Sequence, residues 1–299
     1  MHQQRNGIRI AKFLGLIAGT TLIFGTVSGA HAGSVVILGD SLSVGEGVGL
    51  GNRLDRELRA AGHQITTVAS CGSSPSSYRD DAAAYSTRCG YLKRGPSGAE
   101  EYLPWEKIKG TGGKRTPKLS EIFGASTPDL AVIQQGTNLY GFMLGNPSQG
   151  RELVAKQVSS LLLSSSFRAK ACLWVGPPKI ARYDGKTVSD TQMQAMNQAI
   201  QLGLDRAEKA GKKCRLMDSL PLTERPGGDG IHHMRGSQTD QWVAGAKQAS
   251  LDILSGASTP AVASGQECQE CAMKGALPSS GSALRQIEEI REGIERKSR

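Results

Sequence analysis

Two widely separated segments of this sequence carry side chains suited to nucleophilic catalysis. The segment Gly39-Asp40-Ser41-Leu42-Ser43 places a serine directly after an apolar run. Far along the chain, Asp229 stands three positions before His232. That spacing lets a carboxylate bond one imidazole nitrogen while the other nitrogen faces a serine. These residue types predict a serine nucleophile with a histidine base and an orienting aspartate.

Two further segments carry groups that suit a developing negative charge. Gly72 follows Ser70-Cys71, and Asn138 ends the run Gly136-Thr137-Asn138. A glycine backbone amide and an asparagine side-chain amide are donors that stabilise an oxyanion. Each run alone is an ordinary turn. The prediction depends on their order along the chain and on each run following a predicted strand.

Three histidines remain when the first 32 residues are set aside, namely His63, His232 and His233. Catalytic groups on open α/β sheets gather at the carboxyl ends of the strands. His63 lies in a helix-to-strand turn at the opposite edge, so we expect an exposed turn residue. His233 is the rival base, and the three-residue spacing from Asp229 favours His232.

The elements that must position these residues alternate between strands and helices. Short apolar runs predict five strands, at 34–38, 65–69, 129–134, 172–175 and 214–217. Helical periodicity covers 52–61, 151–163, 190–210 and 238–254. Repeated strand–helix units predict a mostly parallel, five-stranded sheet with helices on both faces. In such a sheet the serine, glycine and asparagine follow the carboxyl ends of successive strands.

Together these motifs resemble those of the SGNH (GDSL) hydrolase superfamily of esterases and lipases. The nucleophile block of that family matches 39–43, and its second block matches Gly72. Its Gly-x-Asn block matches 136–138, and its Asp-x-x-His block matches 229–232. The resemblance covers residues 34 to 254.

The resemblance implies a three-layer α/β/α, flavodoxin-like fold and a serine-esterase mechanism. Ser41 would attack an ester carbonyl, with His232 as the general base and Asp229 orienting that ring. The Ser41 amide, the Gly72 amide and the Asn138 side chain would hold the oxyanion. We expect no cofactor and no metal site.

The composition of the 299-residue chain is that of a soluble globular protein, with 38% hydrophobic and 21% charged residues. Residues 1–32 combine a basic start, an apolar run and a small-residue cleavage point, which is typical of a secretory signal peptide. Its removal lowers the formal net charge from +9 to +6. We therefore predict an exported, periplasmic or secreted protein with no membrane span after cleavage. The modest charge disfavours nucleic-acid binding.

Six cysteines follow the predicted cleavage point, and an even number in an oxidising compartment favours disulfides. Cys172 and Cys214 each open a predicted strand, so a bridge joins them if those strands are neighbours. Cys71 and Cys89 would then staple one loop. The last pair, Cys268-Gln-Glu-Cys271, could form a local disulfide or a redox pair. It lacks the strand-then-helix setting of a thioredoxin site and has no nearby histidine for zinc, so we expect a structural role for it.

Two stretches depart from the strand–helix plan of the predicted hydrolase domain, 33–254. Residues 70–118 form a long insertion rich in Gly, Ser and Lys that leaves the second strand at the catalytic edge. Loops of that length are usually functional. Residues 255–281 have the composition of a flexible linker, and residues 282–299 the pattern of a charged C-terminal helix.

The substrate is predicted from the compartment and from aromatic residues near the motifs. Trp105 stands among lysines and arginines in the insertion, which suits an acylated envelope glycan; a solvated basic loop is the alternative. Tyr140 is a candidate for contact with the acyl group. We expect removal of small acyl groups, acetyl above all, from an envelope carbohydrate such as peptidoglycan. A lysophospholipase- or thioesterase-type acyl hydrolase and a non-catalytic envelope-binding module are the alternatives.

Overall fold

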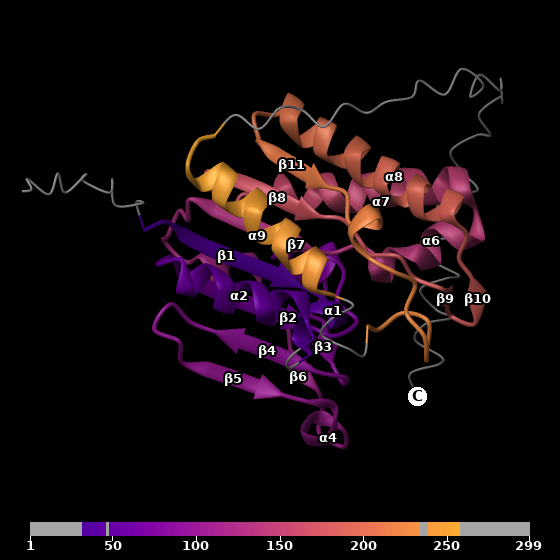
Figure 1. Ribbon diagram of the computed structural model, residues 1–299, viewed down its shortest axis with the longest axis horizontal. Helices are drawn as coiled ribbons and strands as arrows, with labels where there is room; N and C mark the ends of the chain where they lie inside the picture. The colour runs from indigo at the N-terminus through magenta and orange to yellow at the C-terminus, as the bar shows by residue number, and fades with distance from the viewer. Residues whose placement is uncertain (1–31, 46–47, 234–238, 258–299) are drawn as a thin grey trace, which may run out of the picture. The chain divides into compact units, whose positions relative to one another are not determined.

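The computed structural model describes residues 32–45, 48–233 and 239–257 (Figure 1). The predicted signal peptide before Ala32, most of the linker, the Cys268–Cys271 pair and the terminal helix lie outside the described residues. Within the described part of the chain, no helix has both the length and the apolar character needed to cross a membrane.

A seven-stranded sheet forms the centre of the fold, in the order β11-β8-β7-β1-β2-β4-β5. All five predicted strands are present and pair in parallel. They are β1 (Ser34–Gly39), β2 (Gln64–Ser70), β7 (Leu130–Gln134), β8 (Ala171–Val175) and β11 (Cys214–Met217). With the first strand between the second and the third, their order is that of flavodoxin-like folds.

The expected strand count of five was too low, because the insertion supplies two more strands. β4 (Tyr91–Arg94) pairs antiparallel with β2 and with β5 (Glu100–Leu103). Each of these strands has four residues, which leaves about two side chains per face, too few for alternation to stand out in the sequence. The insertion also contains α3 (Pro75–Tyr78), β3 (Ser86–Thr87), α4 (Trp105–Ile108) and β6 (Lys114–Arg115).

Helices cover both faces of the sheet, which confirms the three-layer α/β/α fold (Figure 1). α2 (Leu50–Ala60) and α9 (Asp240–Leu254) pack on one face, and α7 (Pro147–Leu162) and α8 (Asp190–Lys209) on the other. Successive side chains of a strand point to opposite faces. Val35 of β1 therefore joins the α2/α9 layer, and its neighbour joins the α7/α8 layer.

Shorter elements connect these layers. They are α1 (Ser41–Val44), α5 (Leu119–Phe123), η1 (Thr137–Leu139), α6 (Tyr140–Gly145), β9 (Arg182–Tyr183), β10 (Lys186–Thr187) and η2 (Leu220–Leu222). Among them, α1 directly follows β1 and η1 closely follows β7. The predicted nucleophile and the predicted asparagine donor therefore both lie where a central strand ends.

Two predicted disulfides are confirmed. Cys172 and Cys214 are register partners in the adjacent parallel strands β8 and β11, with Cα atoms 4.4 Å apart. Cys71 and Cys89, with Cα atoms 5.5 Å apart, close the segment between β2 and β4. The loop-closure entropy removed from the unfolded chain corresponds to about 4 kcal/mol for the longer loop and about 3 kcal/mol for the shorter one.

One expectation about the opposite edge of the sheet was wrong. His63 is buried rather than exposed, and its Nδ1 accepts a hydrogen bond from the Gly33 amide at 3.0 Å. The local Gly-His-Gln sequence resembles a surface turn. The bond joins the ring to the residue that precedes β1, 30 residues earlier in the chain, and a local sequence pattern cannot indicate such a contact.

Candidate active site

Ser41 opens the four-residue helix α1 immediately beyond the end of β1. Asp40 caps this helix, because its Oδ1 accepts a hydrogen bond from the Leu42 amide at 2.9 Å. The preceding Gly39 permits the sharp turn: a Cβ there would lie 2.2 Å from the Cβ of Ser43. Only glycine leaves room for the helix to fold back so closely over the strand.

Asp229 and His232 form a hydrogen-bonded pair, with Oδ2 and Nδ1 2.6 Å apart. The other carboxylate oxygen of Asp229 accepts bonds from the Ile231 and His232 amides, each at 2.9 Å. Partial burial acts to raise the pKa of Asp229, but the bonds from the His232 ring and these amides outweigh it, and the pKa is lowered. The ionised carboxylate holds a proton on Nδ1 and leaves Nε2 for a second partner.

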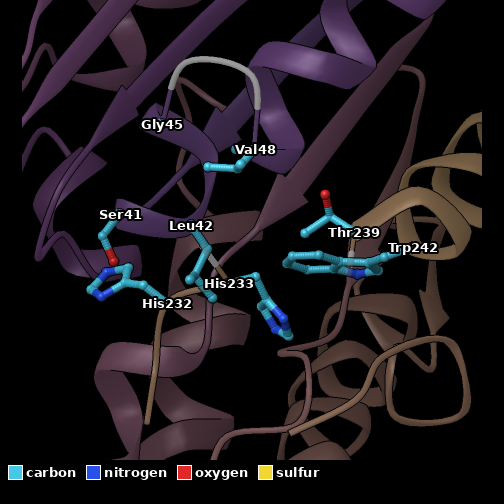
Figure 2. Close-up of a pocket in the computed structure, with 9 residues that line it drawn as sticks. Ser41, Leu42, Gly45, Val48, His232, His233, Thr239 and Trp242 are labelled. Carbon is cyan, nitrogen blue, oxygen red and sulfur yellow. The ribbon is translucent and has the colours of Figure 1, made fainter. Parts of the chain in front are cut away.

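Ser41 and His232 line the same pocket, which has a volume of about 220 Å³. Figure 2 shows the Ser41 hydroxyl pointing toward the His232 ring. Ser41 is only partly buried. The other residues that line the pocket are Leu42, Gly45, Val48, Gly49, His233, Thr239 and Trp242.

Gly72 and Asn138 follow the two strands that flank β1, and both strands stay in register with it as far as Gly39. Asn138 Nδ2 donates to the Ser73 carbonyl at 2.8 Å, which places the asparagine amide beside the residue that follows Gly72. Gly72 has a φ of +77°, a conformation that glycine adopts readily. The structure thus brings both predicted oxyanion donors to the strand ends around Ser41.

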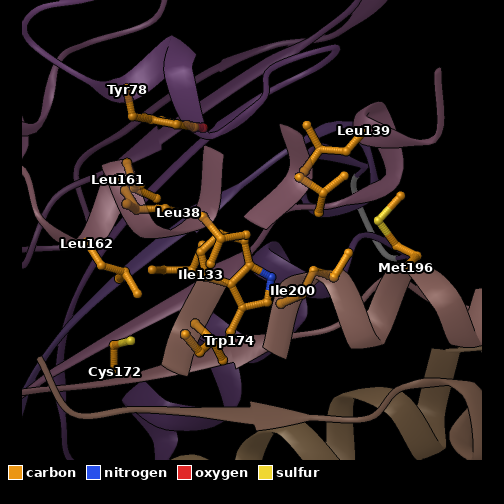
Figure 3. Packing of buried hydrophobic residues seen from close by; sticks show 14 of the residues in the cluster. Leu38, Tyr78, Ile133, Leu139, Leu161, Leu162, Cys172, Trp174, Met196 and Ile200 are labelled. Atoms are coloured by element: carbon orange, nitrogen blue, oxygen red, sulfur yellow. The ribbon is translucent and has the colours of Figure 1, made fainter. Parts of the chain in front are cut away.

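Two residues that no sequence motif singled out tie these strand ends together. Ser73 is fully buried, and its hydroxyl donates to the Gly39 carbonyl at 3.3 Å and accepts from Gln135 Nε2 at 3.2 Å. The Tyr78 hydroxyl donates to the same Gly39 carbonyl at 2.5 Å, from within the core layer drawn in Figure 3. The hydroxyl-rich run that leaves β2 directly after Gly72 was the available signal.

The structure does not bring the two predicted substrate contacts, Tyr140 and Trp105, to the pocket. Tyr140 is fully buried, and its ring centre lies 6.1 Å from that of Tyr183. Trp105 is 47% exposed on α4, with the Lys109 ammonium 5.7 Å from its ring centre. Tyr140 lies two residues after Asn138 in the sequence, but its side chain points into the core. Nor could the sequence show where α4, which carries Trp105, would lie.

Asp40 is the other acidic group of the site, and it is completely buried. Its Oδ2 has no hydrogen-bond partner among the described residues. Burial raises the pKa of Asp40 to about 7, although the hydrogen bond from the Leu42 amide acts in the opposite direction. Over the same described ranges, no three His, Cys, Asp or Glu side chains are grouped so as to hold a metal ion.

No family model matches the chain, and no curated protein matches it. Similar solved structures include a carbohydrate acetylesterase family member from Sinorhizobium meliloti, with 15% identity, a TM-score of 0.46, and coverage of 74% of this chain and 99% of that chain. An acetyl xylan esterase from Geobacillus stearothermophilus has 14% identity, a TM-score of 0.41, and coverage of 74% and 94%. A GDSL-like lipase from Bacteroides thetaiotaomicron VPI-5482 has 14% identity, a TM-score of 0.43, and coverage of 73% and 87%.

Proposed function

We propose that the chain is an exported serine ester hydrolase of the SGNH (GDSL) type that removes small acyl groups, acetyl above all, from a cell-envelope carbohydrate such as peptidoglycan. The main support is the Asp229–His232 hydrogen bond beside Ser41, with both the histidine and the serine lining one pocket. A nucleophile, a base and a residue that orients the base are the minimum set for acyl transfer through a serine ester.

In this mechanism His232 Nε2 takes the proton of Ser41 as the serine oxygen attacks the ester carbonyl. The Asp229 carboxylate stabilises the imidazolium that forms. The resulting tetrahedral intermediate expels the alcohol, which leaves with the proton from His232, and the acyl group remains bound to Ser41. Water then attacks this acyl-enzyme with His232 again as the base, and the free acid is released.

The oxyanion of each tetrahedral intermediate is held by the Ser41 amide, the Gly72 amide and Asn138 Nδ2. One Nδ2 hydrogen of Asn138 bonds the Ser73 carbonyl, and the second is available to the substrate oxygen. The bonds from Ser73 and Tyr78 to Gly39 fix the Gly72 segment before substrate arrives. Donors fixed in advance do not have to reorganise during the reaction, and this is why they lower its barrier.

The small acyl group and the glycan have separate support. The pocket of about 220 Å³ is below the roughly 300–1,000 Å³ typical of sites for drug-sized ligands, which favours short acyl groups. The signal-peptide pattern of residues 1–32 and two disulfides suit the oxidising compartments where envelope glycans lie.

The test is hydrolysis of p-nitrophenyl acetate, butyrate and octanoate by the mature protein, residues 33–299. We expect turnover to be fastest on acetate or butyrate, and Ser41→Ala to reduce kcat by a factor on the order of 10⁴ or more. Ser86→Ala, an exposed serine of β3, is the matched control and should leave kcat unchanged. Acetate release from O-acetylated peptidoglycan then tests the glycan.

Each alternative has its own result in this experiment. Fastest turnover on octanoate would favour a lysophospholipase- or thioesterase-type hydrolase, which needs room for a longer acyl chain. Equal and negligible rates for wild type and Ser41→Ala would favour a non-catalytic envelope-binding module. Ser41-dependent acetate hydrolysis without release of acetate from peptidoglycan would keep the esterase and reject this glycan.

A further inference from the structure

The peptide that joins Cys71 to Gly72 carries the backbone N–H that the proposed mechanism assigns to the oxyanion. Gly72 is exposed, and its N–H makes no hydrogen bond within the described part of the chain. An oxyanion donor lowers the barrier of a reaction because its direction is fixed before the substrate arrives. Whatever fixes the orientation of this peptide therefore contributes to catalysis.

The turn that contains this peptide does not fix its orientation by itself. The Ser73 amide donates to the Ser70 carbonyl at 3.1 Å, which makes Cys71 and Gly72 the central residues of a β-turn. The φ of +77° at Gly72, with no positive φ at Cys71, is that of a type II turn. A type I turn has the same closing hydrogen bond with the central peptide turned over by roughly half a rotation. In that alternative the Gly72 N–H would point to the opposite side.

Tyr85, which directly precedes β3 in the insertion, supplies the missing restraint. Its hydroxyl donates to the Cys71 carbonyl at 2.8 Å. In a trans peptide the C=O and the N–H point in opposite directions within one plane, so the bond that holds the Cys71 carbonyl also sets the direction of the Gly72 N–H. A hydrogen bond accepted by the carbonyl further polarises the peptide, which strengthens its N–H as a donor.

Tyr85 is itself held against the turn. Its carbonyl accepts a hydrogen bond from the Thr116 amide at 2.8 Å, and the Cys71–Cys89 disulfide ties the chain that follows it to the turn. The contact with Gly72 is close, because a Cβ on that residue would lie 2.4 Å from the Tyr85 hydroxyl oxygen. The glycine thus serves two purposes here, since it adopts the positive φ and leaves room for the hydroxyl.

We propose that Tyr85 is a positioning residue of the oxyanion hole, and that its hydroxyl holds the Cys71–Gly72 peptide with the N–H directed at the substrate oxygen. This inference rests on the proposed function and deepens it, because it assigns a role in the reaction to a residue of the insertion. Tyr85 acts through the peptide and does not itself contact the reacting atoms.

The first experiment is Tyr85→Phe, which keeps the ring and removes the hydroxyl. On p-nitrophenyl acetate, kcat and kcat/KM should fall together by about five- to fiftyfold, less than the roughly 10²- to 10³-fold cost of losing a whole donor. KM should stay unchanged, because the bond to the oxyanion is made only in the transition state. Tyr91→Phe, which removes the hydroxyl of a buried tyrosine from β4 of the same insertion, is the control and should keep the wild-type constants.

Inhibition by trifluoroacetone separates positioning from a structural role. The Ser41 oxygen adds to the ketone carbonyl, the Ser41 proton passes to His232, and the carbonyl oxygen becomes an oxyanion in the hole. The inhibition constant should rise in Tyr85→Phe by the same factor by which kcat/KM falls. A lowered unfolding midpoint with unchanged kcat/KM and inhibition constant would show that Tyr85 only stabilises the fold, and would overturn the inference.

The second experiment adds Gly72→Ala to both backgrounds. The new Cβ lies 2.4 Å from the Tyr85 hydroxyl oxygen but 3.6 Å from the ring carbon that carries it, so the alanine displaces a tyrosine and tolerates a phenylalanine. Gly72→Ala should therefore lower kcat by a smaller factor in Tyr85→Phe than in the wild type. Factors that simply multiply would show that the two residues act independently, and would reject the inference.

The wild type distinguishes the failure of this inference from the failure of the proposed function. Absence of Ser41-dependent hydrolysis of p-nitrophenyl acetate would reject the proposed function and the role of Tyr85 with it. Ser41-dependent hydrolysis that Tyr85→Phe leaves at the wild-type rate would reject the role of Tyr85 alone.

Discussion

The two edges of the parallel sheet differ in how completely their polar side chains are hydrogen-bonded. At the amino edge, where the strands begin, His63 accepts a bond from Gly33, and Asp129 accepts bonds from the Ser34 amide, the Ser34 hydroxyl and the Lys170 ammonium at 2.7–2.9 Å. At the carboxyl edge, where the strands end, many buried side chains have an atom with no partner among the described residues. They include Asp40, Gln134, Gln135, Thr137 and His233.

The paired amino edge serves as the structural scaffold, and the carboxyl edge carries the candidate site. An unpaired buried polar atom costs about 1–3 kcal/mol, so a cluster of them is not retained for stability. Their concentration around Ser41 indicates an edge shaped for a ligand, because departures from full satisfaction are expected at functional sites. The paired groups of the amino edge hold β1 and β7 together at the opposite end of those strands. Changes at the carboxyl edge should therefore alter activity, and changes at the amino edge should alter stability.

The largest expected effect is on activity, from Asp229→Asn. The asparagine amide cannot hold a proton on Nδ1 of His232 in the same way, and the ring presents the wrong tautomer to Ser41. We expect kcat on p-nitrophenyl acetate to fall by about 10⁴-fold. The unfolding midpoint should change little, because the Asp229 side chain is 53% exposed. Asp240→Asn, which alters an exposed acid paired with Arg53, is the control. Activity within tenfold of wild type would remove Asp229 from the mechanism.

The second effect is on stability, from Asp40→Asn, and it depends on pH. The folded pKa of Asp40, about 7, lies above its ordinary value of 3.8, so the ionised carboxylate destabilises the native state. The free energy of unfolding of the wild type should fall as the pH rises from about 4 to about 7. Asparagine keeps an oxygen for the Leu42 amide and does not ionise. The variant should therefore be more stable than wild type at pH 8, by up to about 4 kcal/mol.

Denaturant unfolding at pH 4 and pH 8 measures this difference. The advantage of Asp40→Asn should be small at pH 4, where the wild-type carboxyl is protonated in the native state. An advantage that is equal at both pH values would show that the side-chain amide, rather than the missing charge, is responsible. If Asp40→Asn is less stable than wild type at pH 8, the buried carboxyl of Asp40 does not destabilise the native state, and the proposed contrast between the two edges fails at this residue.

How far the sequence predicts each edge depends on the range of the contacts. The five parallel strands were predictable because runs such as Val35–Leu38 are apolar on both faces, and the Cys172–Cys214 bridge followed from strand adjacency. The roles of Tyr78 and His63 were not predictable, because each bonds a backbone group 39 and 30 residues away. Ser41 was predicted from its motif, whereas the burial of His233 and its lack of a hydrogen-bond partner among the described residues are evident only from the structure.

The smallest expected effect tests the amino edge, through Asp129→Asn. The bond from Lys170, with those from Ser34, lowers the pKa of Asp129 to about 2, below its ordinary 3.8. This pairing therefore stabilises the protein above about pH 4, and the stabilisation is lost as the pH falls toward 2. Because the Asp129 side chain is 37% exposed, solvent screening limits the loss in the variant at pH 7 to about 1 kcal/mol.

Activity should not follow this loss of stability. Asp129 precedes the five-residue strand β7, so about 17 Å of extended chain separates it from the carboxyl edge. We expect Asp129→Asn to lower the free energy of unfolding at pH 7 while kcat stays at the wild-type value, and Lys170→Gln to behave in the same way. If the double variant loses no more stability than either single variant, the ion pair itself is responsible. A fall in kcat with unchanged stability would show that the amino edge also shapes the site, and the division between the two edges would have to be given up.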